Sequence, residues 1–411
     1  MFQTDGRRGE APMTASTTAT DPMIRELLNL RDDTGVLSVY VNVDPATEAH
    51  RRPAWQIRLD NDLQAIRRRL HAEGDHADRI ALAERLEALA PALAELTDAA
   101  APGRGRALFA GVRSGVIHSF AVQTGLPTEA MLGDIAHVLP LLRADDGHPR
   151  AMILVGHDTV RALEARLGRA EELQVFDVEP IVYDGAERKG PTAANPLRGQ
   201  QVSTQRERWE RHVEADHQRR LSRVADRLGR LGARRGWELG VVAGDPRGAE
   251  TLLEVLRDAG VESALVDLDI VDVSPARALE DLAPVLDNAA SRRDLALVTR
   301  TRDAADAGGR GAAGLADVLG ALEEGLVERL VLDGERRLRG TITPDGRLVV
   351  AASEHPADPQ FGDRLVLRAV ETSARTSVVG GAAAAALREV DGVAAVLRTQ
   401  SAVVAAARVA S

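Results

Sequence analysis

The sequence of 411 residues contains no cysteine and one lysine, Lys189, among its 52 basic residues. Without cysteine, disulfides, thiol catalysis and every cysteine-containing zinc or iron–sulfur site are excluded. Because Gly190 follows Lys189, a Walker A Gly-Lys-Ser/Thr motif is excluded as well, and no other lysine could serve as a kinase strand lysine or form a Schiff base. Arginine therefore supplies almost all of the positive charge.

Long apolar runs are also missing, since no run approaches the ~18 residues that a membrane span needs. Hydrophobic residues make up 44% of the chain and charged residues 28%, which is typical of globular domains. The net charge of −10 argues against a protein that coats nucleic acid over its whole surface, so any RNA contact must be local. Residues 1–20 have no apolar core and predict a disordered tail, not a signal peptide, on a cytoplasmic protein.

Apolar periodicity and turn signals predict three α/β domains, at residues 21–147, 148–272 and 273–411. In the first domain we expect helices at 24–30, 55–70 and 77–99 and strands at 36–43, 106–112 and 115–122. In the second we expect a strand at 151–155, a helix at 158–167, a strand at 173–178, a polar loop at 184–201, a long helix at 203–234 and a strand at 239–243. In the third we expect a helix from about 275, a strand at 295–298, a helix at 315–323, a strand at 327–332, a polar excursion to about 361, a helix at 365–375 and a strand at 393–397.

Positive charge is concentrated at residues 198–235, where eleven arginines and five acidic residues give a net charge of +6. The apolar residues of this segment recur at helical spacing and predict a buried stripe of Trp209, Val213, Leu221, Val224, Leu228 and Leu231. A second row, about 200° around the helix, is predicted to face solvent and consists of Arg219, Arg223, Arg227, Arg230 and Arg234. Such a row is typical either of a solvated helix with i,i+4 ion pairs, such as Asp216 with Arg220, or of a phosphate-binding surface.

A polar loop precedes this helix and carries three glutamines, Gln200, Gln201 and Gln205, between Arg198 and Arg206. A neutral amide can position a water molecule or bind the edges of RNA bases, but it cannot be a strong base. Composition alone favours an ordinary polar loop.

Three further patterns carry no site. Residues 309–314 match Gly-x-Gly-x-x-Gly, but polar residues precede them instead of a buried strand, which argues against dinucleotide binding. His212 and His217 lie about 140° apart on a helix and do not share a face. The three aspartates at 267–272 fall in an alternating run typical of a solvated strand face. We expect no metal and no cofactor.

Five motifs occur in the order known from one superfamily, over about residues 21–400. They are Leu-Ser-Val-Tyr-Val at 37–41, His-Val-Leu-Pro-Leu-Leu at 137–142, Arg-Gly-Gln-Gln at 198–201 before the arginine-rich helix, the segment 319–333, and Gly-Val-Ala-Ala-Val-Leu-Arg at 392–398. Together they resemble the archaeo-eukaryotic class-1 release factor and Pelota superfamily, in its bacterial branch.

This resemblance implies a release-factor-like N-terminal domain at the decoding centre, an RNase H-like middle domain that reaches the peptidyl-transferase centre, and an L7Ae-like C-terminal domain that contacts a translational GTPase such as elongation factor Tu. Two departures bear on function. Gly199-Gln200-Gln201 stands where release factors have Gly-Gly-Gln, and a positive φ at Gln200 would cost ~1 kcal/mol. The stop-codon motif Asn-Ile-Lys-Ser is absent too, since Lys189 is the only lysine.

The resemblance therefore implies a factor that occupies the ribosomal A site without terminating translation, most similar to hibernation factors of the Balon type. The implied RNA-binding residues are Arg198, Gly199, Gln200, Gln201, Gln205, Arg206, Arg208, Arg219, Arg223, Arg227 and Arg230. Two alternatives stay open. One is a peptidyl-tRNA ester hydrolase with Gln201 or Gln205 as its catalytic residue, and the other is an α/β protein that binds a small ligand or another protein.

Overall fold

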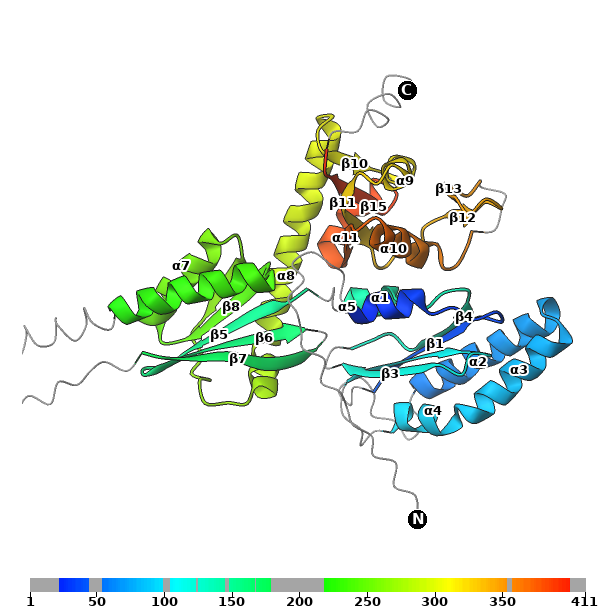
Figure 1. Ribbon diagram of the computed structural model, residues 1–411, viewed down its shortest axis with the longest axis horizontal. Helices are drawn as coiled ribbons and strands as arrows, with labels where there is room; N and C mark the ends of the chain where they lie inside the picture. The colour runs from blue at the N-terminus through cyan, green and yellow to red at the C-terminus, as the bar shows by residue number, and fades with distance from the viewer. Residues whose placement is uncertain are drawn as a thin grey trace, which may run out of the picture.

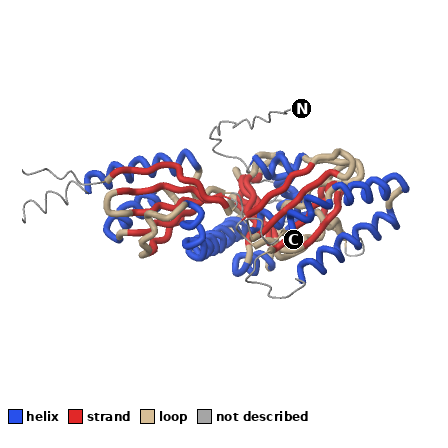
Figure 2. The backbone as a smooth tube through the Cα atoms, turned by 90° about the horizontal axis from the view of Figure 1, so that it is seen from below, coloured by secondary structure: helices blue, strands red, loops and turns tan. Residues whose placement is uncertain are grey.

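The computed structural model describes residues 22–43, 54–98, 104–122, 125–144, 148–166, 168–178, 218–352 and 357–399. Over these residues the chain forms three α/β domains, each built on its own β-sheet (Figure 1). The middle domain is one lobe, and the N- and C-terminal domains pack together as the other (Figure 2). The predicted α/β class is confirmed. The predicted tail at 1–20 lies outside the described residues.

The N-terminal domain is an antiparallel sheet, in the order β3-β2-β1-β4, with helices on both faces. Its elements are α1 (Pro22–Asn29), β1 (Val36–Asn42), α2 (Ala54–Glu73), α3 (His76–Ala88), α4 (Ala90–Thr97), β2 (Gly105–Gly111), β3 (Ile117–Val122), β4 (Glu129–Gly133) and α5 (Leu139–Ala144). The helices α2, α3 and α4 cover one face of the sheet, while α1 and α5 lie between the other face and the C-terminal domain (Figure 1).

The single helix expected at 77–99 is wrong, because it is broken at Leu89 into α3 and α4. Pro91 stands in the first turn of α4, where a missing backbone N–H costs nothing. Further inside a helix, a proline removes a hydrogen bond and clashes with the preceding turn. The proline therefore starts a new helix instead of continuing the old one.

The middle domain has a five-stranded sheet in the order β7-β6-β5-β8-β9. Its elements are β5 (Arg150–Val155), β6 (Thr159–Arg166), β7 (Arg169–Asp177), a helix at 218–235, β8 (Leu239–Gly244), α7 (Pro246–Asp258) and β9 (Glu262–Val266). Only β6 runs antiparallel to the others, an arrangement in keeping with the expected RNase H-like sheet. The helix 218–235 and α7 cover one face, and α8 covers the other.

Two predictions for this domain are wrong. The segment expected as a helix at 158–167 is strand β6, which pairs with β5 and β7. Because β6 is buried on both faces, its sequence lacks the alternation of apolar and polar residues that marks a half-exposed strand. The aspartates at 267–272 do not continue a strand, because β9 ends at Val266. We did not predict α7 or β9.

The helix α8 (Pro275–Asp306) is continuous over 32 residues, so the strand expected at 295–298 is wrong. Its first half packs Ala278, Leu282 and Leu286 on the sheet of the middle domain. Its second half packs Leu297 and Val298 against the C-terminal domain. One helix thus belongs to the cores of two domains.

The C-terminal domain has a four-stranded sheet in the order β10-β15-β11-β14. Its elements are β10 (Gly311–Ala313), α9 (Leu315–Glu323), β11 (Val327–Asp333), β12 (Gly340–Ile342), β13 (Leu348–Val350), α10 (Phe361–Glu371), β14 (Arg375–Val379), α11 (Gly381–Arg388) and β15 (Val393–Leu397). The predicted excursion to 361 contains the β12–β13 hairpin, and β14 and α11 were not predicted. Residues 309–314 contain β10 and the N-cap of α9, Gly314, and do not form a dinucleotide-binding turn.

A single apolar core joins the N- and C-terminal domains. It contains Leu27 of α1 and Leu141 of α5 from one side, and Phe361 and Leu365 of α10 from the other, all fully buried. The side chain of Gln360 lies directly against the backbone of Gly133 here, since a Cβ on Gly133 would lie 1.9 Å from its side-chain oxygen. The two domains therefore form one packed unit, although the middle domain separates them in sequence.

A buried polar cluster lies inside this junction. The carboxylate of Asp363, fully buried in α10, accepts hydrogen bonds from the backbone N–H of Val138 (2.8 Å) and Leu139 (3.0 Å) at the start of α5. Its other oxygen lies 2.6 Å from Nδ1 of His137, and Nε2 of His137 lies 3.6 Å from Glu129. Burial alone would lower the pKa of His137, but the carboxylates of Asp363 and Glu129 raise it to about 10.

This pKa predicts how stability depends on pH. His137 has a usual pKa of 6.5, so a value of about 10 in the folded chain means that folding favours its charged form. The resulting stabilisation is present in full below pH 6.5 and is lost as pH rises toward 10. Because one pKa unit is worth ~1.4 kcal/mol, the upper bound on this stabilisation is about 5 kcal/mol. Urea unfolding at pH 6.5, 8 and 9.5 should show a steeper loss of stability in the parent chain than in His137→Gln. Parallel pH profiles would contradict the charged state of His137.

The middle domain meets the C-terminal domain through an ionic contact. Glu238, just before β8, accepts hydrogen bonds from Arg329 of β11 (2.5 and 2.9 Å) and from Arg375 of β14 (2.6 Å). Burial alone would raise the pKa of Glu238, but the guanidinium of Arg329 lowers it to about 2. This contact is polar, in contrast to the apolar junction of the N- and C-terminal domains.

Candidate nucleic-acid interface

The predicted RNA-binding residues fall into two groups in the structure. Those on the glutamine loop and at the start of the long helix lie outside the described residues, namely Arg198, Gly199, Gln200, Gln201, Gln205, Arg206 and Arg208. His212, His217, Asp216, Trp209 and Val213 lie there as well. The other four predicted RNA-binding residues are all on the helix 218–235, and they are Arg219, Arg223, Arg227 and Arg230.

Apolar packing fixes the orientation of the helix 218–235. Leu221, Val224 and Leu228 are buried against the sheet, and Leu231 packs at the edge of the same core. The predicted buried stripe is therefore confirmed over the described part of the helix. Burying a leucine side chain stabilises a fold by ~1.5–3 kcal/mol, so this stripe strongly disfavours rotation of the helix about its axis.

The opposite side of the helix carries a row of exposed arginines. Arg219, Arg223, Arg227, Arg230 and Arg234 are all exposed, as the sequence predicted. Successive members are about 4.5–6 Å apart along the helix axis. Below, the basic face means Arg223, Arg227, Arg230 and Arg234. Arg219 is not included, because it already interacts with other groups.

Most of the basic face is free of carboxylate partners. Among the described residues, no acidic side chain forms an ion pair with Arg223, Arg230 or Arg234. The guanidinium carbon of Arg227 lies 5.0 Å from the ring centre of Phe176 in β7, a cation–π contact that leaves its charge available. Unpaired guanidiniums in a row can bind several phosphates of a nucleic acid backbone.

The next arginine along the helix has a different role. Arg235 forms a two-pronged ion pair with the buried carboxylate of Glu164 in β6, at 2.6 and 2.9 Å, and Trp237 Nε1 donates to the same carboxylate at 2.8 Å. This pairing raises the pKa of Arg235. Sequence reasoning missed the cluster, because it counted Arg235 with the charged segment and did not predict that Glu164 is buried. Arg235 fixes the end of the helix, whereas no described carboxylate holds the arginines of the basic face in this way.

The basic face begins at one tip of the molecule. Strand β7 ends, and the helix 218–235 begins, at the end of the middle domain that points away from the other lobe (Figure 1). The segment with the predicted Arg198–Gln201 motif connects these two points in sequence. The basic face is therefore continuous in sequence with that motif.

The described residues contain neither a candidate metal site nor a candidate membrane span. Over that part of the chain, no group of three or more histidine, aspartate or glutamate side chains could hold a metal ion. No helix among the described residues has the length and apolar character needed to cross a bilayer.

The middle domain can be compared with a known family. Residues 149–267 match the model of bacterial archaeo-eukaryotic release factor family 5. The match covers 119 of the 411 residues, so it is a likeness of the middle domain to that family. The matched segment includes the whole sheet of the domain and the basic face. The resemblance read from the sequence is thus confirmed at the level of the superfamily.

The solved structures that match the chain are distant ones. The archaeal translation termination factor aRF1 is 18% identical over 92% of this chain and 96% of its own, with a TM-score of 0.24. Archaeal Pelota, in a structure described as a model of ribosome-bound Pelota and ABCE1, is 14% identical over 72% of this chain and 78% of its own, with a TM-score of 0.39. Pelota from Archaeoglobus fulgidus is 16% identical over 72% and 79%, with a TM-score of 0.30. No curated protein matches the sequence.

Proposed function

We propose that this chain is a ribosome-binding translation factor of the release factor and Pelota type. The observation that carries the proposal is the basic face on a domain that matches a release factor family. A net charge of −10 disfavours general binding to nucleic acid, so binding by the basic face would be confined to one site.

Within this role, we propose that the chain occupies the A site without terminating translation and acts as a hibernation factor. The support comes from the sequence, in which Gln200 replaces the second glycine of the hydrolytic motif and no lysine is present in the N-terminal domain to read a stop codon. A translational GTPase such as elongation factor Tu is the partner proposed for the C-terminal domain. The competing role is peptidyl-tRNA hydrolysis by Gln201 or Gln205.

Two measurements on one set of variants test these roles. The parent chain should co-sediment with 70S ribosomes at low salt, dissociate as salt rises, and release no peptide from complexes stalled at a stop codon. In Gln201→Ala and Gln205→Ala, a lost neutral hydrogen bond of ~0.5–1.5 kcal/mol should weaken binding by about 2- to 13-fold.

A hydrolase would give the opposite pattern. A glutamine that positions the attacking water acts mainly in the transition state, so its loss should lower cleavage by orders of magnitude and leave binding nearly unchanged. Robust peptidyl-tRNA cleavage by the parent chain, abolished in either variant, would therefore establish the hydrolase and reject the non-catalytic role. Failure to co-sediment at any salt concentration would reject both.

A further inference from the structure

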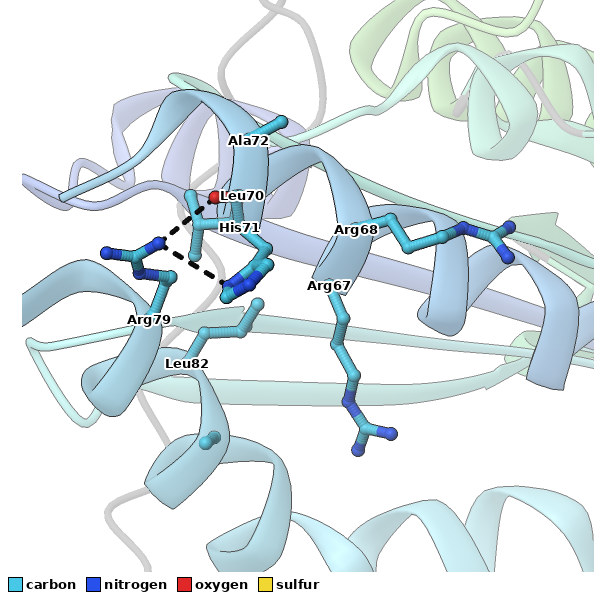
Figure 3. A pocket seen from close by; sticks show the side chains of 8 residues that line it. Arg67, Arg68, Leu70, His71, Ala72, Arg79 and Leu82 are labelled. Carbon is cyan, nitrogen blue, oxygen red and sulfur yellow. Dashed lines mark hydrogen bonds between the residues drawn. The ribbon is translucent and has the colours of Figure 1, made fainter. Parts of the chain in front are cut away.

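A pocket of about 430 Å³ lies in the N-terminal domain, between α2 and α3 (Figure 3). Leu70 and Leu82 contribute apolar surface to it, together with two alanines. Arg67, Arg68 and His71 of α2 and Arg79 of α3 complete the lining. The volume lies within the range of ordinary small-molecule sites, ~300–1,000 Å³. Sequence reasoning did not identify these residues as a site.

The arginines of this pocket have no carboxylate partner among the side chains that the structure describes. Arg67 and Arg68 are exposed and form no ion pair with any described residue. Arg79 donates to the backbone oxygen of His71 at 3.1 Å and lies 3.4 Å from its ring Nδ1, also without an acidic partner in the described chain (Figure 3). The neighbouring Arg69 differs, since it donates to the backbone oxygen of Leu132 in β4.

Two acidic residues at the start of α3 already form hydrogen bonds. Asp75 caps the first turn of α3 by accepting from the backbone N–H of Asp78 at 2.7 Å. Asp78 accepts from Thr34 at 2.7 Å and from Arg113 at 2.9 Å, and these hydrogen bonds lower its pKa. The side chains of Arg67, Arg68 and Arg79 extend to different sides of the apolar surface (Figure 3), and none has an acidic partner among the described side chains.

We propose that this pocket binds a nucleoside phosphate. Guanidinium groups bind phosphate through paired hydrogen bonds and also stack on flat aromatic rings. The leucine and alanine surface suits one face of a base, and an arginine at its edge suits a phosphate. An inorganic anion would make no use of the apolar surface, and an apolar ligand would make no use of the arginines. The ligand is either a free nucleotide or one nucleotide of a single-stranded RNA.

Calorimetric titration can test the site apart from the basic face. The full-length chain carrying Arg223→Ala, Arg227→Ala and Arg230→Ala provides the background, so that RNA binding by the helix 218–235 does not contribute. The probes are ATP and the ribohexamer A6. At least one should bind saturably at a single site, and adding Arg67→Ala and Arg79→Ala should weaken that binding about tenfold or more, since charge-assisted phosphate contacts are lost.

The control is Arg58→Ala, which removes an exposed arginine from the same helix outside the pocket and should leave affinity unchanged. Binding of ATP identifies a free nucleotide, and binding of A6 alone identifies RNA; both support the proposal. It is overturned if neither probe binds saturably, if Arg58→Ala weakens binding as much as the pocket variants, or if pyrophosphate competes as well as ATP. None of these outcomes depends on ribosome binding, so the proposed function stands or fails separately.

Discussion

Reversing the charge of Arg223, Arg227 and Arg230 to glutamate should weaken binding to 70S ribosomes by about 100- to 1,000-fold. These side chains are exposed, and none pairs with a described carboxylate, so the free chain should lose little stability. Three phosphate contacts worth ~0.9–1.4 kcal/mol each account for the expected loss. The slope of log affinity against log salt concentration should also become less negative by about two to three, because fewer counterions are released on binding.

The matched control reverses Arg58, Arg300 and Arg310, which are also exposed, form no ion pair with a described residue and give the same change in net charge. Co-sedimentation over a range of salt concentrations measures both triple variants. Equal weakening in the two variants would indicate an effect of overall charge. Binding of the first variant at the parental level would mean that the basic face is only a solvated helix surface.

Replacing Asp363 by alanine should lower the free energy of unfolding by about 3–5 kcal/mol, the usual cost of removing one partner from a buried charged pair. The charged His137 and two backbone N–H groups would each lose their acceptor inside the junction of the N- and C-terminal domains. Urea unfolding followed by circular dichroism measures the effect.

Two further variants identify its cause. Asp363→Asn keeps an oxygen that can accept from Val138 and Leu139 but removes the negative charge, so it should destabilise less than alanine. Glu323→Ala breaks an exposed ion pair with Arg347 and should cost less than ~1 kcal/mol. If Asp363→Ala costs no more than Glu323→Ala, the cluster does not hold the two domains together.

The sequence predicted those elements whose burial follows a clear period. The helix 218–235 is the best case, because Leu221, Val224 and Leu228 recur at helical spacing and the arginines fall on the other side. The sequence does not show that 158–167 is a strand, because β6 lies between β5 and β7 and is buried on both faces of the sheet. Even Glu164 is buried there. The apolar residues near 297 resembled a strand, since nothing local shows that α8 continues into another domain.

The contacts between domains could not be predicted in this way. Asp363 meets His137 across more than two hundred residues of sequence, and Glu238 meets Arg329 and Arg375 in another domain. A single sequence carries no signal for such pairs. The pocket at Arg67 and Arg79 is similar, because its lining comes from two helices whose relative position depends on how both pack on the sheet.

The core shared by the N- and C-terminal domains also affects the order of events during synthesis. Leu27 and Leu141 leave the ribosome long before Phe361, Leu365 and the last strand, β15, are made. At ~5–20 residues per second, the chain between Leu141 and β15 takes roughly 13–50 s to synthesise. During that time one side of the nascent N-terminal domain has no partner and exposes apolar side chains that are fully buried in the finished protein. The early part of this chain therefore depends on chaperones, or on its own solubility, until translation is almost complete.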